Sequence, residues 1–188
     1  MTTRAEEAEL LARVVNGDHD AFTALMRAHE DRVFSVCLRI MGDRERALDA
    51  TQETFLTIFR KAGQFQGKSA LGTWIYRIAV NRCYDELRKA KRERTDPLHD
   101  YVDPADPAAD DELAAAGLRP GLRSALLSLP AEFRAAVVLS DIEGLSVAEA
   151  AEALGVPEGT VKSRVFRGRR MLAVRLGNQM GDESIKEV

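Results

Sequence analysis

The chain has few of the residues from which metal and disulfide sites are built. It holds two cysteines and three histidines in 188 residues. Cys37 and Cys83 lie far apart within apolar helical patterns, and neither has a cysteine or histidine at metal-ligand spacing. We therefore expect two reduced thiols in a core and no metal site.

Long apolar runs and catalytic motifs are also missing. No segment approaches the roughly 20 apolar residues of a membrane span, and the first residues, MTTRAEEAELLARV, are acidic and amphipathic rather than signal-like. The sequence has no glycine-rich phosphate loop, no HExxH and no nucleophile elbow. These absences predict a cytoplasmic protein that is not an enzyme, needs no cofactor and is not inserted in a membrane.

The apolar residues of the first half do not alternate with period two but recur at helical spacing, which predicts an all-α fold. Stop and start signals divide this half into helices. Asn16-Gly17 ends a first helix, Asp18 or Asp20 caps a second that Gly42 ends, and Asp43 caps a third that runs to about residue 62. A loop from residue 63 to about residue 72 then precedes a long fourth helix.

A composition change separates two small helical domains. Residues 95–111, TDPLHDYVDPADPAADD, are acidic and contain three prolines, as is typical of a flexible linker. We place the first domain at residues 1–94, the acidic linker at 95–117, the second domain at 118–177 and a tail at 178–188. Helices resume near Leu118, and Pro130 opens the next one.

The second domain contains a predicted helix-turn-helix. Ser146 and Glu149 form a capping box that begins one short helix. Gly155 suits the left-handed residue that ends it, and Pro157 opens the next helix. Alanines in the first of the two helices allow a crossing helix to approach closely.

The second of these helices has one apolar and one basic face. Val161, Val165, Gly168 and Leu172 fall on one side at 100° per residue. From Thr160 to Arg175 there are six basic residues and no acid, although the whole chain carries a net charge of −3. Arginine, lysine and serine can contact base edges in a major groove, and Phe166 can pack against a thymine methyl. The alternative is a basic solvated helix. The candidate DNA-reading residues are Thr160, Lys162, Ser163, Phe166, Arg167 and Arg170.

The third helix carries a mixed-charge stripe opposite its core side. Ala47, Thr51, Phe55, Ile58 and Phe59 are predicted to face inward. An exposed leucine framed by charges of both signs is typical of a protein-binding rim, although a solvated face explains it equally well. The stripe consists of Asp49, Gln52, Glu53, Leu56 and Arg60.

The fourth helix carries a second group of nucleic-acid-binding residue types. Asparagine, tyrosine and arginine on one face can hold a strand by hydrogen bonds, stacking and charge. The preceding loop is short and polar enough to form a pocket wall, whereas Trp74 falls with the core residues. The face consists of Arg77, Asn81, Tyr84 and Arg88, and the loop residues are Phe65, Gln66, Gly67, Lys68 and Ser69.

Three segments in this order resemble the sigma-70 superfamily, in its extracytoplasmic-function (ECF, group 4) branch. DATQETFLTIFR resembles sigma region 2.2, FQGKSALGTWIYRIAVNRCYDELRK resembles regions 2.3 and 2.4, and LPAEFRAAVVLSDIEGLSVAEAAEALGVPEGTVKSRVFRGRR resembles region 4. The resemblance covers almost the whole chain. It implies a sigma factor that directs core RNA polymerase to promoters and promotes strand opening.

The resemblance also assigns a role to each predicted face. The stripe on the third helix would dock on the clamp helices of the polymerase β′ subunit, with further contact to the β subunit. The loop with Asn81 would capture a flipped non-template base of the −10 element, and the basic face of the last helix would read the −35 element as duplex. A cognate anti-sigma factor is a further expected partner.

Two other functions share some of these sequence features. A response-regulator output protein shares a similar helix-turn-helix, but its N-terminal half would be a signal receiver, which the all-helical half with its mixed-charge stripe does not resemble. A helical adaptor that binds no DNA is disfavoured by the acid-free basic helix.

Overall fold

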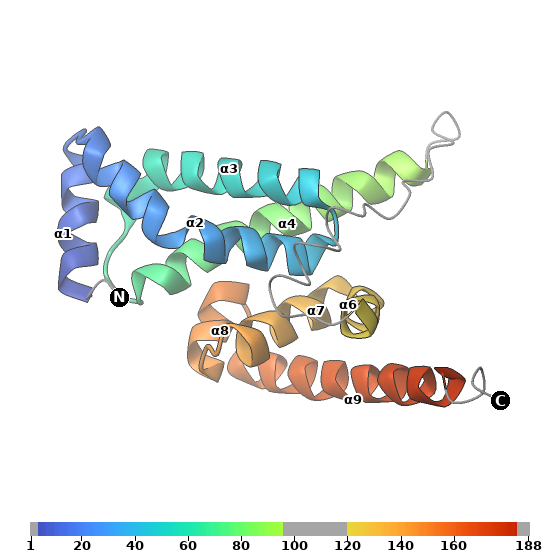
Figure 1. The fold of residues 1–188 in the computed structure, drawn as a ribbon. Coiled ribbons are helices and arrows are strands. Elements are labelled where there is room, and N and C mark those ends of the chain that lie inside the picture. Colours follow the sequence, from blue (N-terminus) through green and yellow to red (C-terminus); the bar gives the residue numbers. More distant parts are fainter. Residues whose placement is uncertain (1–3, 96–119, 184–188) are drawn as a thin grey trace.

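A computed structural model describes residues 4–95 and 120–183, with side chains described for 6–92 and 121–177. Every regular element in these ranges is helical, which confirms the all-α prediction (Figure 1). The N-terminal helices are α1 (Arg4–Val15), α2 (His19–Met41), α3 (Arg44–Lys61), the 3-10 turn η1 (Ala62–Gln64) and α4 (Leu71–Thr95). The C-terminal elements are α6 (Pro120–Leu127), α7 (Ala131–Val137), the π-helical turn η2 (Val138–Ile142), α8 (Val147–Leu154) and α9 (Glu158–Glu183).

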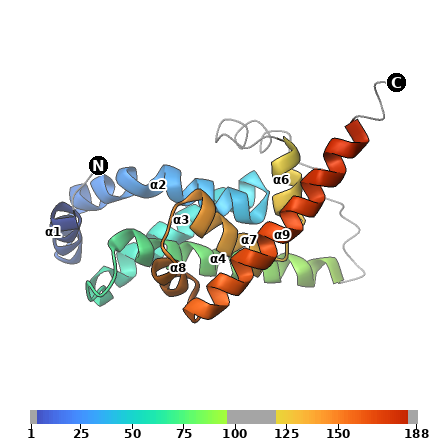
Figure 2. The ribbon, with the colours of Figure 1, turned by 90° about the horizontal axis from the view of Figure 1, so that it is seen from below.

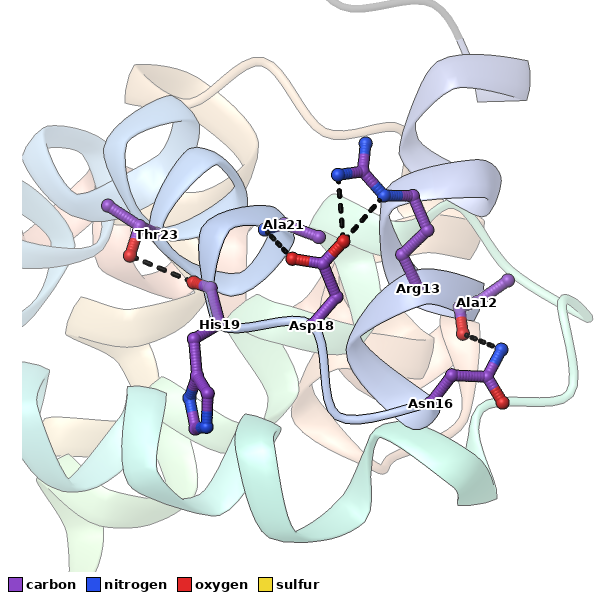
Figure 3. A network of polar contacts seen from close by, with 7 residues as sticks. All are labelled: Ala12, Arg13, Asn16, Asp18, His19, Ala21 and Thr23. Atoms are coloured by element: carbon purple, nitrogen blue, oxygen red, sulfur yellow. Dashed lines mark hydrogen bonds and ion pairs between the residues drawn. The ribbon is translucent and has the colours of Figure 1, made fainter.

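The helix ends follow the predicted capping residues. Of the two candidates, Asp18 caps α2, and its carboxylate accepts a hydrogen bond from the backbone N–H of Ala21. Gly42 ends this helix with a left-handed φ of 73°, and Asp43 caps α3. The same Asp18 carboxylate accepts a hydrogen bond of 2.9 Å from Arg13 Nε, so one side chain both begins α2 and ties α1 to it (Figure 3).

The N-terminal core brings the two cysteines together, although they are far apart in sequence. Cys37 and Cys83 are both fully buried and both free thiols. Contact with Cys37, together with burial, raises the pKa of the Cys83 thiol. The two residues are therefore reduced core thiols, as predicted.

One predicted core residue of α3 is not buried. Phe59 is 40% exposed and packs beside the rings of His19 and Phe22, at centroid distances of 6.0 and 5.0 Å. Four residues after Phe55, it is rotated about 40° further around the helix, to the border of the buried stripe. The expectation that Phe59 belongs to the core was wrong, because the α2 N-terminus covers it only in part.

Two boundaries differ from those expected. Helix α4 begins at Leu71, before the glycine that was predicted to close the loop. Helix α9 continues to Glu183, well into the segment predicted to be a tail. The predicted linker, apart from Thr95 at the end of α4, and the predicted helix start at Leu118 lie outside the described residues.

The C-terminal helices pack directly on the N-terminal ones. Helix α8 lies against α4, and α6 and α7 lie against α2 (Figures 1 and 2). Buried residues from Leu11 to Val165 form one hydrophobic cluster that spans both halves. The two helical domains therefore share a core in this structure, with α9 on the side away from α3.

Polar contacts reinforce this packing. Arg134, which is buried, donates to the carbonyls of Ile40 and Leu129. Arg123 donates to the Gly42 carbonyl at 3.0 Å. Both arginines thus reach backbone acceptors near the end of α2, where a helix leaves carbonyls without intrahelical partners.

Candidate nucleic-acid interface

The helix-turn-helix is built as its sequence predicts. Ser146 Oγ accepts from the Glu149 backbone N–H, and the Glu149 carboxylate accepts from the Ser146 backbone N–H. Gly155 ends α8 with a φ of 64°, and the Val156 backbone N–H donates to the Ala151 carbonyl. The turn therefore fixes the angle at which α9 leaves α8.

The predicted basic face of α9 is exposed. Val161, Val165 and Gly168 are buried on the opposite side. Phe166 has 68% of its surface exposed, the largest fraction among the exposed large hydrophobic residues of the described chain. Lys162, Ser163, Arg167 and Arg170 are exposed with it, and Thr160 is half-buried at the start of the face.

The position of α9 depends on a close approach to α7. A Cβ added at Gly168 would lie 2.7 Å from a methyl group of Val137 and 3.5 Å from the Phe133 carbonyl oxygen. A side chain at this position would require Val137 or one of the two helices to shift. The sequence placed Gly168 on the inner face but gave no sign that α7 would cross at this point.

A carboxylate from outside the helix-turn-helix reaches the basic helix. Both Asp141 carboxylate oxygens, on η2, accept from Arg169, one of them from Nε at 2.9 Å. Hydrogen bonding to Asp141 and the charge of that carboxylate raise the pKa of Arg169. The acid-free stretch from Thr160 to Arg175 therefore has an acidic neighbour that only the fold brings near.

Helix α4 presents part of its predicted face to solvent. Arg77, Asn81 and Arg88 are exposed, and Arg88 forms an ion pair with Asp85 on the same helix. Tyr84 is half-buried against the core, with its hydroxyl inaccessible to solvent. Burial raises the pKa of Tyr84 to about 12. In this structure Tyr84 does not share the exposed face on which the sequence placed it.

The loop before α4 has one anchored and several exposed residues. The Phe65 ring packs against Trp74 with a centroid distance of 5.3 Å. Gln66, Gly67 and Lys68 are exposed and Ser69 is half-buried. Asn81 lies about 15 Å along the helix axis from Leu71, where the loop joins α4. The loop and Asn81 could therefore contact a bound strand only at separate points along α4.

The mixed-charge stripe on α3 is at the surface. Asp49, Gln52 and Arg60 are exposed, and Leu56 is 45% exposed in the middle of the stripe. Glu53 pairs with Arg82 of α4 at 2.5 Å. No local pattern predicts this ion pair, because the two residues are 29 positions apart.

Two further features bear on other kinds of site. The part of the chain that the structure describes holds no group of three or more histidine, cysteine or acidic residues able to bind a metal ion. Among the helices described, none combines the length and apolar character needed to cross a bilayer.

Known protein families match both halves of the chain. The sigma-70 region 2 family matches residues 25–93, and the sigma-70 region 4 family matches residues 121–172. The ECF RNA polymerase sigma factor SigM of Mycobacterium tuberculosis is 44% identical over 91% of this chain and 85% of its own length. The chain belongs to the ECF sigma factors of the sigma-70 family.

Other relatives agree with this assignment. The ECF sigma factor SigW of Bacillus subtilis is 32% identical over 88% of this chain and 94% of its own length. Among solved structures, the sigma factor RpoE of Bartonella quintana, in complex with the anti-sigma factor NepR, has a TM-score of 0.69 and 25% identity over 83% of this chain and 96% of its own. CnrH in complex with the cytosolic domain of CnrY has a TM-score of 0.68 and 26% identity over 92% of this chain and 97% of its own.

The family matches place the faces of this ECF sigma factor in named regions. Helices α3 and α4, with the loop between them, fall in region 2. The helix-turn-helix of α8 and the first half of α9 falls in region 4. The signal-receiver alternative is thereby excluded, because the N-terminal half is a sigma region 2 domain.

Proposed function

We propose that this ECF sigma factor brings core RNA polymerase to promoters by reading the −35 element with α9 and the −10 element with α4 and its preceding loop. The proposal includes the domain limits 1–94, 95–117, 118–177 and 178–188 and the residue roles predicted from the sequence. Its setting is the cytoplasm, and it requires no enzymatic step.

The observation that carries the proposal is the face of α9. Phe166 is 68% exposed between Lys162, Arg167 and Arg170. An aromatic ring held in water among cations is unfavourable unless an apolar group covers it, and a thymine methyl in a major groove fits that requirement beside arginines that bind guanine.

Strand opening would draw on the exposed part of α4. Unstacking a base costs a few kcal/mol, and hydrogen bonds and stacking to the flipped base can offset that cost. Asn81 offers the hydrogen bonds, Arg77 a charge for the backbone, and the loop from Phe65 to Ser69 a second contact. Because two elements are bound by one chain, each bound domain raises the effective concentration of the other.

Two partners complete the proposal. The stripe of Asp49, Gln52, Glu53, Leu56 and Arg60 would contact the polymerase β′ clamp helices, with a further contact to the β subunit. The structurally similar RpoE is in complex with the anti-sigma factor NepR, and CnrH is in complex with the cytosolic domain of CnrY. By analogy, a cognate anti-sigma factor would bind this chain.

The polymerase contact is tested by placing a charge in the middle of the stripe. Leu56→Arg should abolish retention on immobilised core polymerase and should leave the circular dichroism spectrum unchanged. Val15→Arg is the matched control, because Val15 is a similarly exposed apolar residue, at 53%, on α1 outside the stripe. Equal retention of both variants would exclude the stripe as the docking surface. The same assay separates a sigma factor from an adaptor that binds no polymerase.

Strand opening is tested at Asn81. Asn81→Ala should reduce transcription from a fully paired promoter, and the defect should shrink when the −10 element is already mismatched, since the mismatch removes part of the unpairing cost. Full activity on the paired promoter would remove Asn81 from the melting site.

A further inference from the structure

Helices α3 and α4, which carry two of the predicted binding faces, pack on each other (Figure 1). An ion pair joins the two helices at their surface. Arg82 of α4 donates to the Glu53 carboxylate of α3 at 2.5 Å, and the two side chains are 34% and 44% exposed. Solvent reaches both charged groups, so each can exchange this partner for another.

Arg82 directly follows Asn81 but lies outside the predicted nucleic-acid face. Consecutive helical residues are about 100° apart around the axis and about 1.5 Å apart along it. Since Arg82 pairs with α3, it borders the predicted face on the α3 side. Its long side chain can turn from α3 toward a strand that lies along α4, and a planar guanidinium can bind a phosphate through two parallel hydrogen bonds.

Glu53 and a strand phosphate would compete for this guanidinium. Carboxylate and phosphate are both anions that arginine binds through paired oxygens, and two anions side by side at one guanidinium repel each other. An ion pair as exposed as this one contributes little free energy. A phosphate can therefore replace the carboxylate at a small cost, and anything that removes Glu53 from Arg82 should strengthen the binding of a strand.

The neighbouring Arg88 is paired in a different way. Its partner Asp85 is on the same helix, three residues away, so a protein docked on α3 need not disturb that pair. Glu53, in contrast, belongs to the mixed-charge stripe proposed to bind polymerase. Of these two arginine pairs, only the one between Arg82 and Glu53 connects the proposed polymerase surface with the proposed nucleic-acid surface.

We propose that Arg82 binds a phosphate of the separated −10 strand, and that Glu53 occupies the Arg82 guanidinium until polymerase docking on α3 draws the carboxylate away. The inference rests on the function proposed above, because it deepens the roles given there to α3 and α4. The exchange of carboxylate for phosphate at Arg82 can nevertheless be measured without polymerase. Because coupling between two sites is reciprocal, a bound strand should also favour docking on α3.

The first test measures the affinity of the free full chain for an oligothymidylate, by fluorescence anisotropy over a range of salt concentrations. Glu53→Gln should tighten binding about two- to fivefold and steepen the salt dependence by about 0.7, the contribution of one phosphate contact on a single strand. Arg82→Gln alone should change the affinity little, and added to Glu53→Gln it should abolish the gain. Glu45→Gln is the matched control, because it removes an exposed acid of α3 outside the stripe without affecting the Arg82 pair.

The second test adds core polymerase and a single strand that carries the −10 element of a promoter transcribed by the holoenzyme. Arg82→Gln should weaken strand binding by the holoenzyme about three- to tenfold and lower the salt dependence by about 0.7, and Arg82→Lys should keep most of the binding. Retention of Arg82→Gln on core polymerase should be unchanged or up to about fivefold stronger, because docking no longer has to break the pair. A merely structural ion pair predicts weaker retention instead.

The outcomes separate this inference from the proposed function. Equal oligothymidylate affinity of Glu53→Gln and the original chain, or a gain that survives Arg82→Gln, would overturn the exchange at Arg82. An Arg82→Gln holoenzyme that binds the −10 strand as tightly as the original one would overturn the role of Arg82 in the complex. A chain that shows the exchange but supports no promoter-specific transcription with core polymerase would overturn the proposed function and leave the exchange standing.

Discussion

Helix α9 turns its predicted base-contacting side chains to solvent, whereas α4 has one of its own, Tyr84, half-buried against the hydrophobic cluster. Both helices show the same kind of pattern in the sequence, with apolar residues on one side and basic residues on the other. Periodicity orders side chains around their own helix, but it carries no information about which distant segment covers them. The acidic partners of the two helices are equally invisible to periodicity, because Asp141 pairs with Arg169 and Glu53 pairs with Arg82 across the fold.

The largest expected effect comes from a substitution at the close crossing of α9 with α7, which holds the exposed face of α9 in place. Gly168→Val should lower the free energy of unfolding by about 3 kcal/mol, because the added side chain must displace Val137 or the Phe133 backbone. Gly177→Val is the control in the same helix, with no atom within 4 Å of an added Cβ, and should change stability by less than about 0.5 kcal/mol. Chemical denaturation followed by circular dichroism compares them. Equal effects at both positions would show that the crossing tolerates a side chain.

Base reading on α9 can be separated from backbone contact. Arg167→Ala should weaken binding to the preferred −35 sequence by about 2 kcal/mol if Arg167 contacts a base bidentately, and should relax the preference at one position. Arg175→Ala, further along the helix, should weaken all sequences about equally. Fluorescence anisotropy over a panel of duplexes measures both, and parallel shifts across the panel would contradict the division.

The stability that the capping box at the start of α8 provides should depend on pH. Ser146→Ala removes the capping box and should cost about 1 kcal/mol. Hydrogen bonds from the Ser146 hydroxyl and backbone lower the pKa of Glu149 below its ordinary 4.5. A lowered pKa stabilises the folded state above pH 4.5, and this contribution disappears as the pH falls through the folded-state value. The stability difference between the original chain and Glu149→Gln should therefore be full at pH 7 and shrink below about pH 4.5; a difference that stays constant to pH 3 would exclude this linkage.

The smallest effect concerns the acid that the fold brings to α9. Asp141→Asn should leave Arg169 in place and raise affinity for duplexes of every sequence by about threefold or less, since exposed ion pairs are weak. The increase should fade as salt rises from 50 to about 200 mM. A sequence-dependent gain would mean that Asp141 orients a base-reading side chain.

Much of the fold follows from local signals in the sequence. Ser146, Gly155 and Asp43 act within a few residues of themselves, and the helix ends lie where these caps predict. Helical periodicity wrongly predicts a core position for Phe59, because this residue lies at the edge of the buried stripe, where a few tens of degrees decide exposure. The thiol contact of Cys37 and Cys83 and the covering of Tyr84 depend on packing between segments far apart in sequence, which no local pattern encodes.

The candidate faces themselves came from residue type and spacing. The exposed arc of α9 and the exposed stripe of α3 lie where the sequence places them, although their binding roles stay predictions. The contact of Glu143 with Arg39 and Tyr76 could not be predicted in this way, because these two residues are 104 and 67 positions from it. A single glutamate after a helix has no distinguishing signature.

The hydrophobic cluster that runs without a break from Leu11 to Val165 also determines how the molecule melts. Domains that share a buried core lose their contacts together, so a calorimeter should record one endotherm for this chain, with equal calorimetric and van't Hoff enthalpies. A chain with separated domains has two independent cores, and its heat-capacity trace should divide into two peaks whose order reflects which half keeps the larger core. Thermal cooperativity in this protein is thus a property of the contact between α4 and α8 rather than of either half.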